Sequence, residues 1–503
     1  MIESHLRMSM RTKRSSESHA STGVAGLDHV LIGGFPRDHL YLVEGDPGTG
    51  KTTMALQFLL EGRERGESGL YVTLSESKNE LVQIAASHGW NLDGVAIFEM
   101  TPTEAELSPE AQYTVFHPSD VELSDTTNSI LKQVDEASPS RVVFDSLSEL
   151  RLLARDALRY RRQILALKRY FSGRKCTVLM LDDRTSEAHD LQVQSIAHGV
   201  IVMERLDREF GVNRRRLEVR KLRGARYSEG FHDFTIDTGG IVLHPRLIAA
   251  EHTGSGRREP VPSGLQELDD LLGGGIDTGT STLLIGPAGA GKSTVALQYA
   301  ITAANRGQTA MVLSFDETLA TVLGRATSFG MPLQKHLDSG TMLVQQVDPA
   351  ELSPGAFVTL IRDAVENRSV RLLIIDSLNG LLNAMPGERY FTLQLHELLS
   401  YLSQLGVATL MTVAQQGVMG VAMNSPVDIT YIADTVILFR YFEAGGAIRH
   451  AISVQKKRSG MHECSIRELT FRSGKLQIGP ALSEFEGVLT GLPTFVGGRK
   501  DLA

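Results

Sequence analysis

The sequence predicts an α/β fold built from two tandem domains, each with a mainly parallel central sheet. Short β-rich runs alternate with helical patterns, as expected of strand–helix–strand units. The same motifs recur roughly 240 residues later, and a period of that size is a whole domain rather than a solenoid repeat. In each half a glycine-rich loop stands between a strand-like and a helix-like segment.

The expected elements of the first half follow a simple order. The apolar runs at residues 40–44 and 70–74 are typical of buried strands, as are those at 141–145 and 177–181. Residues 52–65 carry apolar side chains on one side and predict a helix. The glycine-rich loop should therefore join a strand to a helix.

The repeat also predicts the domain boundaries. We expect a disordered tail over residues 1–20, which are rich in Arg and Ser, and a first domain over 21–247. A flexible linker over 248–260 is predicted from its Gly, Ser and charged residues. The second domain should cover 261–490, with a short tail over 491–503.

Composition excludes several classes of protein. The chain has 51 Lys and Arg against 59 Asp and Glu, a net charge of −8, and general nucleic-acid coating needs basic faces instead. Cys176 and Cys464 are the only cysteines, too few for a disulfide framework or a four-thiolate zinc site. No apolar run approaches the roughly 18 residues of a membrane-spanning helix, so we expect a cytoplasmic protein without a membrane segment.

Both glycine-rich loops fit the phosphate-binding pattern G-x-x-x-x-G-K-[ST]. Glycines allow several backbone N–H groups to face one anion, and the lysine reaches the β and γ phosphates of a nucleotide such as ATP. The alternative is a glycine turn with an exposed lysine, which two matches in register disfavour. The residues expected to contact nucleotide are Gly45, Gly48, Gly50, Lys51, Thr52 and Thr53 in the first loop, and Gly286, Gly289, Gly291, Lys292, Ser293 and Thr294 in the second.

A magnesium ion normally accompanies the phosphates. Thr52 and Ser293 offer it a hydroxyl. Asp145 and Asp376 each end an apolar strand and precede Ser-Leu, and the carboxyl end of such a strand lies beside the loop. We therefore predict these four residues as the Mg²⁺ ligands; the alternative is that each Asp only caps the following turn.

Hydrolysis requires a base or a residue that orients water near the γ-phosphate. Glu76 and Glu317 occupy equivalent places after the strand that follows the loop helix, and Asp316 precedes Glu317. We predict Glu76, Asp316 and Glu317 as catalytic residues. Solvated loop acids are the alternative.

A Lys-x-Arg pair occurs in both halves, at Lys221 and Arg223 and at Lys456 and Arg458. Side chains two apart on a strand share one face, so each pair could grip a γ-phosphate and stabilise transition-state charge. If one subunit lends the pair to its neighbour, ATP lies between protomers and a ring is favoured. The alternative is a basic edge strand that discourages aggregation.

Together these motifs resemble a known family. The segments STGVAGLDHVLIGGFP and GDPGTGKTT, repeated as PSGLQELDDLLGGG and GPAGAGKST, resemble the RecA-like P-loop ATPases. The two-copy arrangement, with FDSLSEL matching IDSLNGL and KLRG matching KKRSG, resembles the KaiC family of circadian-clock ATPases and their bacterial relatives.

The resemblance implies an assembly and a pair of activities. A KaiC-like chain forms a homohexamer with two rings, and binds ATP and Mg²⁺ at subunit interfaces. The N-terminal ring is a slow ATPase, and the C-terminal ring phosphorylates and dephosphorylates a Ser-Thr pair in its own domain. The Lys-x-Arg pairs match the residues that act on the neighbouring subunit.

Some positions depart from the family pattern. The family commonly has Glu-Glu where this chain has Ser75-Glu76 and Asp316-Glu317, so N-terminal hydrolysis must rely on Glu76 or be weak. Thr430 and Tyr431 stand at the phosphorylation sites, and we expect Thr430 to be the acceptor. The chain stops at Ala503, so binding of KaiA is disfavoured, whereas a KaiB-like or other signalling partner is left open.

Two other functions compete with a self-phosphorylating signalling ATPase. A DNA-dependent ATPase of the RecA/RadA type shares the fold, but the net charge of −8, the doubled domain and the lack of a Cys₄ zinc module oppose it. A nucleotide-gated scaffold without catalysis is the other alternative, kept open for the first domain by Ser75.

Overall fold

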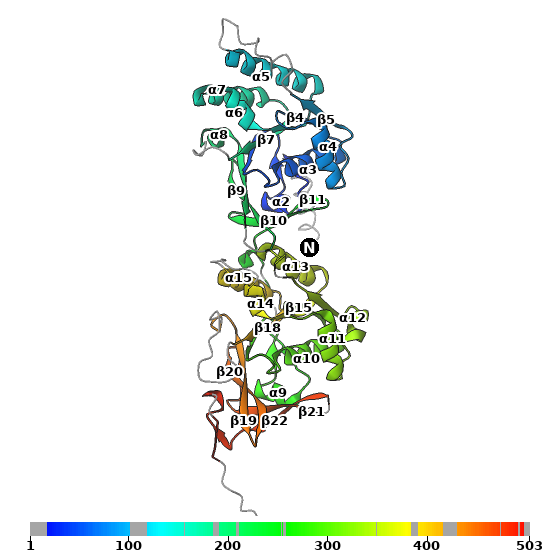
Figure 1. Cartoon of the computed structure of the whole chain (residues 1–503), viewed down its shortest axis with the longest axis vertical. Helices are drawn as coiled ribbons and strands as arrows, with labels where there is room; N and C mark the ends of the chain where they lie inside the picture. Colours follow the sequence, from blue (N-terminus) through cyan, green and yellow to red (C-terminus); the bar gives the residue numbers. More distant parts are fainter. Residues whose placement is uncertain are drawn as a thin grey trace, which may run out of the picture. The chain divides into compact units, whose positions relative to one another are not determined.

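The computed structural model consists of two compact units, one up to Arg246 and one from Leu247 onward (Figure 1). The structure describes residues 18–100, 118–154, 156–184, 191–207, 211–252, 254, 258–348, 350–383, 391–415, 430–472, 474–490 and 493–496. Among these residues no helix is both long and apolar enough to cross a membrane.

The first unit alternates strands and helices and then ends in a run of strands. Its elements are β1 (His19–Ala20), α2 (Leu27–Val30), β2 (Phe35–Pro36), β3 (Leu40–Gly45), α3 (Lys51–Glu64), β4 (Gly69–Thr73), α4 (Lys78–Ser87), β5 (Val95–Glu99), α5 (Pro118–Ala137), β6 (Arg141–Asp145), α6 (Leu147–Ala154), α7 (Ala157–Phe171), β7 (Thr177–Asp183), α8 (Leu191–Ile196), β8 (Gly199–Leu206), β9 (Arg214–Leu222), β10 (Phe231–Asp237) and β11 (Gly240–His244).

The second unit repeats this order with small variations. Its elements are η2 (Ala249–Glu251), β12 (Pro260–Val261), α9 (Gln266–Leu271), β13 (Ile276–Asp277), β14 (Ser281–Gly286), α10 (Lys292–Asn305), β15 (Thr309–Ser314), α11 (Leu319–Ser328), α12 (Leu333–Asp338), β16 (Met342–Gln346), α13 (Pro354–Asn367), β17 (Val370–Asp376), α14 (Leu378–Asn383), α15 (Phe391–Gln404), β18 (Ala408–Ala414), β19 (Thr435–Ala444), β20 (Ala447–Lys457), β21 (Ile466–Arg472), β22 (Lys475–Ala481), β23 (Phe485–Glu486), η3 (Val488–Thr490) and β24 (Thr494–Phe495).

Each unit is built on a nine-stranded sheet with the same strand order. In the first unit it is β5-β4-β6-β7-β3-β8-β9-β10-β11, and in the second β16-β15-β17-β18-β14-β19-β20-β21-β22. In the first sheet, the neighbouring strands β5, β4, β6, β7, β3 and β8 pair in parallel. The remaining neighbours β8, β9, β10 and β11 pair antiparallel. The predicted α/β class with two RecA-like P-loop domains and mainly parallel sheets is confirmed.

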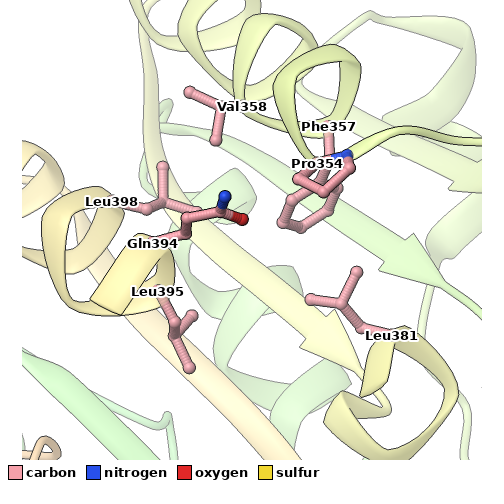
Figure 2. Close-up of a pocket in the computed structure, with 7 residues that line it drawn as sticks. All are labelled: Pro354, Phe357, Val358, Leu381, Gln394, Leu395 and Leu398. Carbon is pink, nitrogen blue, oxygen red and sulfur yellow. The ribbon is translucent and has the colours of Figure 1, made fainter. Parts of the chain in front are cut away.

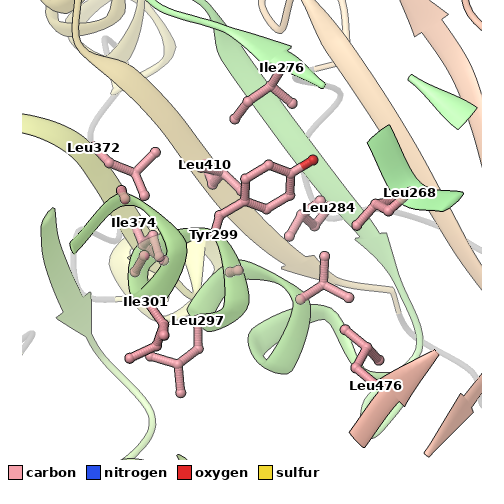
Figure 3. Close-up of a cluster of buried hydrophobic side chains, with 14 of the residues drawn as sticks. Leu268, Ile276, Leu284, Leu297, Tyr299, Ile301, Leu372, Ile374, Leu410 and Leu476 are labelled. Atoms are coloured by element: carbon pink, nitrogen blue, oxygen red, sulfur yellow. The ribbon is translucent and has the colours of Figure 1, made fainter. Parts of the chain in front are cut away.

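The strand residues alternate between two apolar layers, because successive side chains point to opposite faces. In β3, Tyr41 and Val43 join the cluster under α3 and α4, whereas Leu40 and Leu42 join the cluster under α6 and α7. The second unit repeats the arrangement. Figure 3 shows one layer of it, where Tyr299 of α10 packs among strand residues that include Leu284 and Leu410.

The other layer of the second unit lies under α13, α14 and α15. A small apolar pocket opens between these helices (Figure 2). Phe357 and Val358 come from α13, Leu381 from α14, and Leu395 and Leu398 from α15. The pocket belongs to the layer of helices that covers the sheet. None of its lining residues belongs to the glycine-rich loop.

Several residues expected to lie in tails or in the linker form ordered contacts. Residues 1–17 lie outside the described residues, but β1 pairs with β2, and Ala20 is fully buried. Ala249, in the expected linker, is part of the apolar core of the second unit and donates its N–H to Glu397. In the expected C-terminal tail, β24 pairs with β23. These segments carry apolar residues that a composition argument passed over.

A buried ion pair joins the start of β6 to the segment that follows the loop helix α3. Arg141 begins β6 and is fully buried. Its Nε donates to Glu67 over 2.5 Å, and its Nη1 donates to the carbonyls of Ser21 and Phe58. Removing one partner of a buried pair leaves an uncompensated charge in the core.

We predict that Glu67→Ala lowers the free energy of unfolding of the first unit by about 3 kcal/mol. Trp90 is the only tryptophan in the chain and lies in this unit, so its fluorescence during urea unfolding measures the loss. Arg65→Ala is the control, since it breaks an exposed pair with Glu61 that contributes under about 1 kcal/mol. Equal effects of the two substitutions would contradict the prediction.

Candidate functional site

The glycine-rich loop of the first unit lies at the carboxyl end of β3 and leads directly into α3. Gly50 caps the helix with φ 102°, a left-handed conformation that favours glycine. A Cβ at this position would lie 2.6 Å from Cδ1 of Ile236. The loop therefore passes too close to the sheet for a side chain, and it leads into the amino end of α3, whose unpaired N–H groups favour an anion.

The loop of the second unit has the same geometry. Gly291 caps α10 with φ 97°, and a Cβ there would lie 2.5 Å from Cζ of Phe471. Beside the loop is a pocket of about 330 Å³. It is lined by Gly289, Gly291, Lys292, Ser293, Thr294, Glu317, Arg325, Phe329, His450 and Phe471. Five residues predicted to contact nucleotide and the predicted catalytic Glu317 therefore line one pocket. The aromatic side chains of Phe329, His450 and Phe471 line the same pocket.

The two loop lysines are buried and bend back over their own loops. Lys51 Nζ donates to the carbonyls of Gly45 (2.8 Å) and Asp46 (3.1 Å). Lys292 Nζ donates to those of Gly286 (2.9 Å) and Pro287 (2.7 Å). Burial lowers the pKa of Lys292 to about 8. An anionic phosphate beside this lysine would favour its charged form.

The predicted magnesium ligands meet in both units. Thr52 donates its hydroxyl to Asp145 over 3.2 Å, and Ser293 donates to Asp376 over 3.0 Å. Burial raises the pKa of both aspartates, a cost that a cation would offset. In the described residues no group of three His, Cys, Asp or Glu could hold a metal. One hydroxyl and one carboxylate fit Mg²⁺, which takes its remaining ligands from phosphate and water.

The predicted catalytic acids have unequal surroundings. Burial, aided by the nearby carboxylates of Asp145, Glu80 and Asp183, raises the pKa of Glu76 to about 7. Glu317 instead accepts a 2.6 Å hydrogen bond from Arg325 of α11. The repeat places Ile84 at the position of Arg325, so the first unit has no equivalent cation there.

Asp316 points to a different partner from Glu317. Its carboxylate accepts a hydrogen bond from Ser377, the residue after Asp376, over 2.5 Å. The acid is thereby tied to the loop that follows β17. In the first unit the corresponding position is Ser75, which has no carboxylate.

The Lys-x-Arg pairs lie at the ends of interior strands. β9 runs between β8 and β10, and β20 between β19 and β21. The lysines themselves pair only with β8 and β19, because the pairing with β10 and β21 stops before Lys221 and Lys456. In the first unit Lys221 donates to the carbonyls of Gln194 and Ala197, and Arg223 donates to that of Ser195. The side chains of Lys221 and Arg223 thus both point to the carboxyl end of α8.

The second pair contacts the predicted phosphorylation segment. Lys456 donates to the carbonyls of Thr430 and Ala433, and Arg458 donates to that of Tyr431. Thr430 is half-buried and the side chain of Tyr431 is 57% exposed. Ile429, the residue before them, lies outside the described residues.

Sequence reasoning missed two charged residues of the sites. Asp183 ends β7 and lies 2.7 Å from Lys51, between Oδ1 and Nζ. The rule that found Asp145, an acid at the end of an apolar strand, applies equally to Asp183. Arg325 had no such signal: it lies on α11, eight residues after Glu317, which stands just before that helix.

A family model described as the KaiC ATPase matches residues 20–248 and, a second time, residues 261–483. The chain belongs to the KaiC ATPase family. The double match coincides with the two sheets, so each copy of the KaiC domain contains one complete loop. Membership in an ATPase family agrees with nucleotide binding at these loops.

Named KaiC relatives align over nearly the whole chain. Circadian clock protein KaiC3 of Synechocystis is 26% identical over 487 residues, covering 94% of each chain. The circadian clock oscillator protein KaiC of Prochlorococcus marinus MIT 9313 is 28% identical, covering 94% of this chain and 95% of its own. That of Thermosynechococcus vestitus is 27% identical, covering 94% and 91%.

We predict that Lys51→Ala and Lys292→Ala each remove one of two nucleotide sites. Each lysine is buried in its own unit, and its hydrogen bonds and ion pairs in the described part of the chain are to its own loop carbonyls and, for Lys51, to Asp183. Isothermal titration with ADP and Mg²⁺ should therefore give about half of the sites per chain in each variant. Loss of all binding from one substitution would show that the sites are not independent.

Proposed function

We propose that this KaiC-family ATPase is a homohexamer of two rings that binds Mg-ATP between subunits, hydrolyses it slowly and phosphorylates itself in the second unit. It would act as a signalling or timing protein. The observation that supports this best is that both units contain the same three groups: a lysine held over its loop, a hydroxyl at the start of the loop helix, and a strand-end carboxylate that accepts a hydrogen bond from that hydroxyl.

The chain's own residues suit the steps of phosphoryl transfer. The N–H groups after Gly50 and Gly291 bind the phosphates, and Lys51 and Lys292 neutralise their β and γ oxygens. Thr52 with Asp145, and Ser293 with Asp376, hold Mg²⁺. When bound, the ion supplies charge neutralisation on the phosphate oxygens.

Glu76 is the base that we propose for the first unit. Its Oε2 is buried and meets no hydrogen-bond partner among the described residues, so it is available to accept a proton from water. A carboxylate with a pKa near 7 is well matched to general-base catalysis at neutral pH. In the second unit Glu317 takes this role, with Asp316 as a second acid.

Arginine is the residue of each Lys-x-Arg pair that we propose to act on the neighbouring subunit. The side chain of Arg458 is 51% exposed, and Arg223 is also exposed. A guanidinium has five N–H donors, so each arginine keeps donors beyond its bond to a backbone carbonyl. Charge supplied in this way stabilises the transition state.

A nucleotide-gated scaffold is the alternative for the first unit, favoured by Ser75 in place of an acid. A KaiB-like or other signalling protein is the partner class we propose for either version. Neither version uses DNA, whose binding the net charge of −8 disfavours.

We predict that nucleotide drives assembly. ATP between protomers adds contacts that exist only in the ring, so binding should stabilise the oligomer by mass action. Light scattering with ATP and Mg²⁺ should give close to six times 54.9 kDa. The double variant Lys51→Ala/Lys292→Ala should stay smaller, and a wild-type monomer under saturating ATP would contradict the ring.

We predict a pH-dependent turnover for the first unit. In Lys292→Ala only this unit hydrolyses ATP, and the active form of Glu76 is the carboxylate. Because its pKa is raised to about 7, turnover should rise roughly tenfold per pH unit below 7 and level off near pH 8. The added variant Glu76→Gln should be slow and flat from pH 5.5 to 8. An unchanged profile would exclude Glu76 as the base.

We predict phosphorylation of Thr430 rather than Tyr431. In-line transfer requires a hydroxyl within a few ångströms of the γ-phosphorus, and the phenol of Tyr431 stands further from the backbone than a threonine hydroxyl. Phosphopeptide mass spectrometry after incubation with Mg-ATP tests this, with Thr430→Ala as control. Phosphate on Tyr431 alone would refute the geometric argument, and none at all would favour an ATPase without autokinase activity.

A further inference from the structure

Lys51 has an acidic partner that its counterpart in the second unit lacks. An ammonium group has three N–H donors. Those of Lys51 meet the carbonyls of Gly45 and Asp46 and, over 2.7 Å, the carboxylate of Asp183. All of its donors therefore have acceptors within the chain, and one of those acceptors is charged.

The repeat supplies an internal comparison for this contact. Gly45 of β3 is paired in register with Asp183 of β7, and Gly286 of β14 is paired in the same way with Ala414 of β18. Ala414 carries no polar side chain, and Lys292 contacts only loop carbonyls among the described residues. Asp183 is thus a feature of the first unit rather than a requirement of the fold.

A carboxylate and a phosphate are alternative acceptors for the same lysine N–H. The side chain of Lys51 is 8% exposed and that of Asp183 is 29% exposed. Solvent therefore screens the attraction between them only in part, and the exposed side of Asp183 leaves access for an incoming anion. We propose that Asp183 competes with nucleotide phosphate for Lys51 and lowers the affinity of the first unit for nucleotide. This inference rests on the proposed role of Lys51 in binding phosphate.

The neighbourhood of Asp183 supports competition rather than assistance. Its charge acts on Asp145 and on Glu76, which places three carboxylates around one lysine. Mg²⁺ would neutralise Asp145 and the raised pKa of Glu76 reduces its charge, so the carboxylate of Asp183 is the like charge that a polyphosphate meets beside Lys51. Removing the one that pairs with Lys51 both frees a donor and reduces the repulsion, so the two effects have the same sign.

The test is carried out on the full chain with Lys292→Ala, so that only the first unit binds. Isothermal titration with ADP and Mg²⁺ compares this variant with the same variant carrying Asp183→Asn, which keeps the shape and removes the charge. Replacing a partly exposed, charge-assisted bond by at most a neutral one should tighten binding about tenfold. A purely structural role for Asp183 would give weaker or unchanged binding, and either result overturns the inference.

Two further variants complete the design. Asp135→Asn is the matched control, since Asp135 pairs with the exposed Arg174 and should leave the affinity unchanged. If Asp183→Asn does not fold, Ala414→Asp decides: in a Lys51→Ala chain it should weaken ADP binding to the second unit about tenfold, and unchanged binding refutes competition. If Lys292→Ala itself binds no ADP, the proposed function of the first loop fails, whatever Asp183 does.

Discussion

The hydrogen bond between the first turn of each loop helix and the end of a neighbouring strand fixes both sites. Thr52 of α3 reaches Asp145 of β6, and Ser293 of α10 reaches Asp376 of β17. The partners meet because β3, β7 and β6 are parallel neighbours whose carboxyl ends lie at one edge of the sheet. A shift of one residue in register would turn the carboxylate to the opposite face, so the parallel pairing of the core determines the geometry of the site.

The sequence was enough to predict the loops, the strands that lead into them and two of the strand-end carboxylates, although Asp183 at the end of β7 was missed. The runs at 40–44 and 141–145 became β3 and β6, and the loops and their carboxylates lie together as expected. The sequence did not predict which groups the charged residues of the sites would contact. Arg325 of α11 reaches back to Glu317 before the start of that helix, and Lys221 meets the end of α8 through the pairing of β8 with β9. Such contacts join residues whose spacing in sequence carries no pattern.

The two units keep one backbone and differ in the charges placed on it. At matching register positions the first unit has Glu44 and Asp182, and the second has Ile285 and Val413. Burial raises the pKa of both acids, while hydrogen bonds from Gln194 to Glu44 and from Arg151 to Asp182 oppose the rise. Satisfied polar groups can thus replace apolar ones at the same positions of the sheet. Duplication preserved the fold while each copy acquired its own electrostatic surroundings.

The hydrogen bonds of the Lys-x-Arg pairs separate the roles of lysine and arginine. Lys221 contacts three carbonyls at the end of α8, and so uses every donor of its ammonium group. Such a lysine acts as a cap for a helix end, where a cation is favoured. The guanidinium of Arg458 donates to the carbonyl of Tyr431 and forms a long ion pair of 3.8 Å with Asp434, and half of the side chain is in solvent. In the proposed ring, Arg458 can hold the acceptor segment of its own subunit and still present N–H groups to a neighbour's phosphate, whereas Lys221 has no N–H left to present.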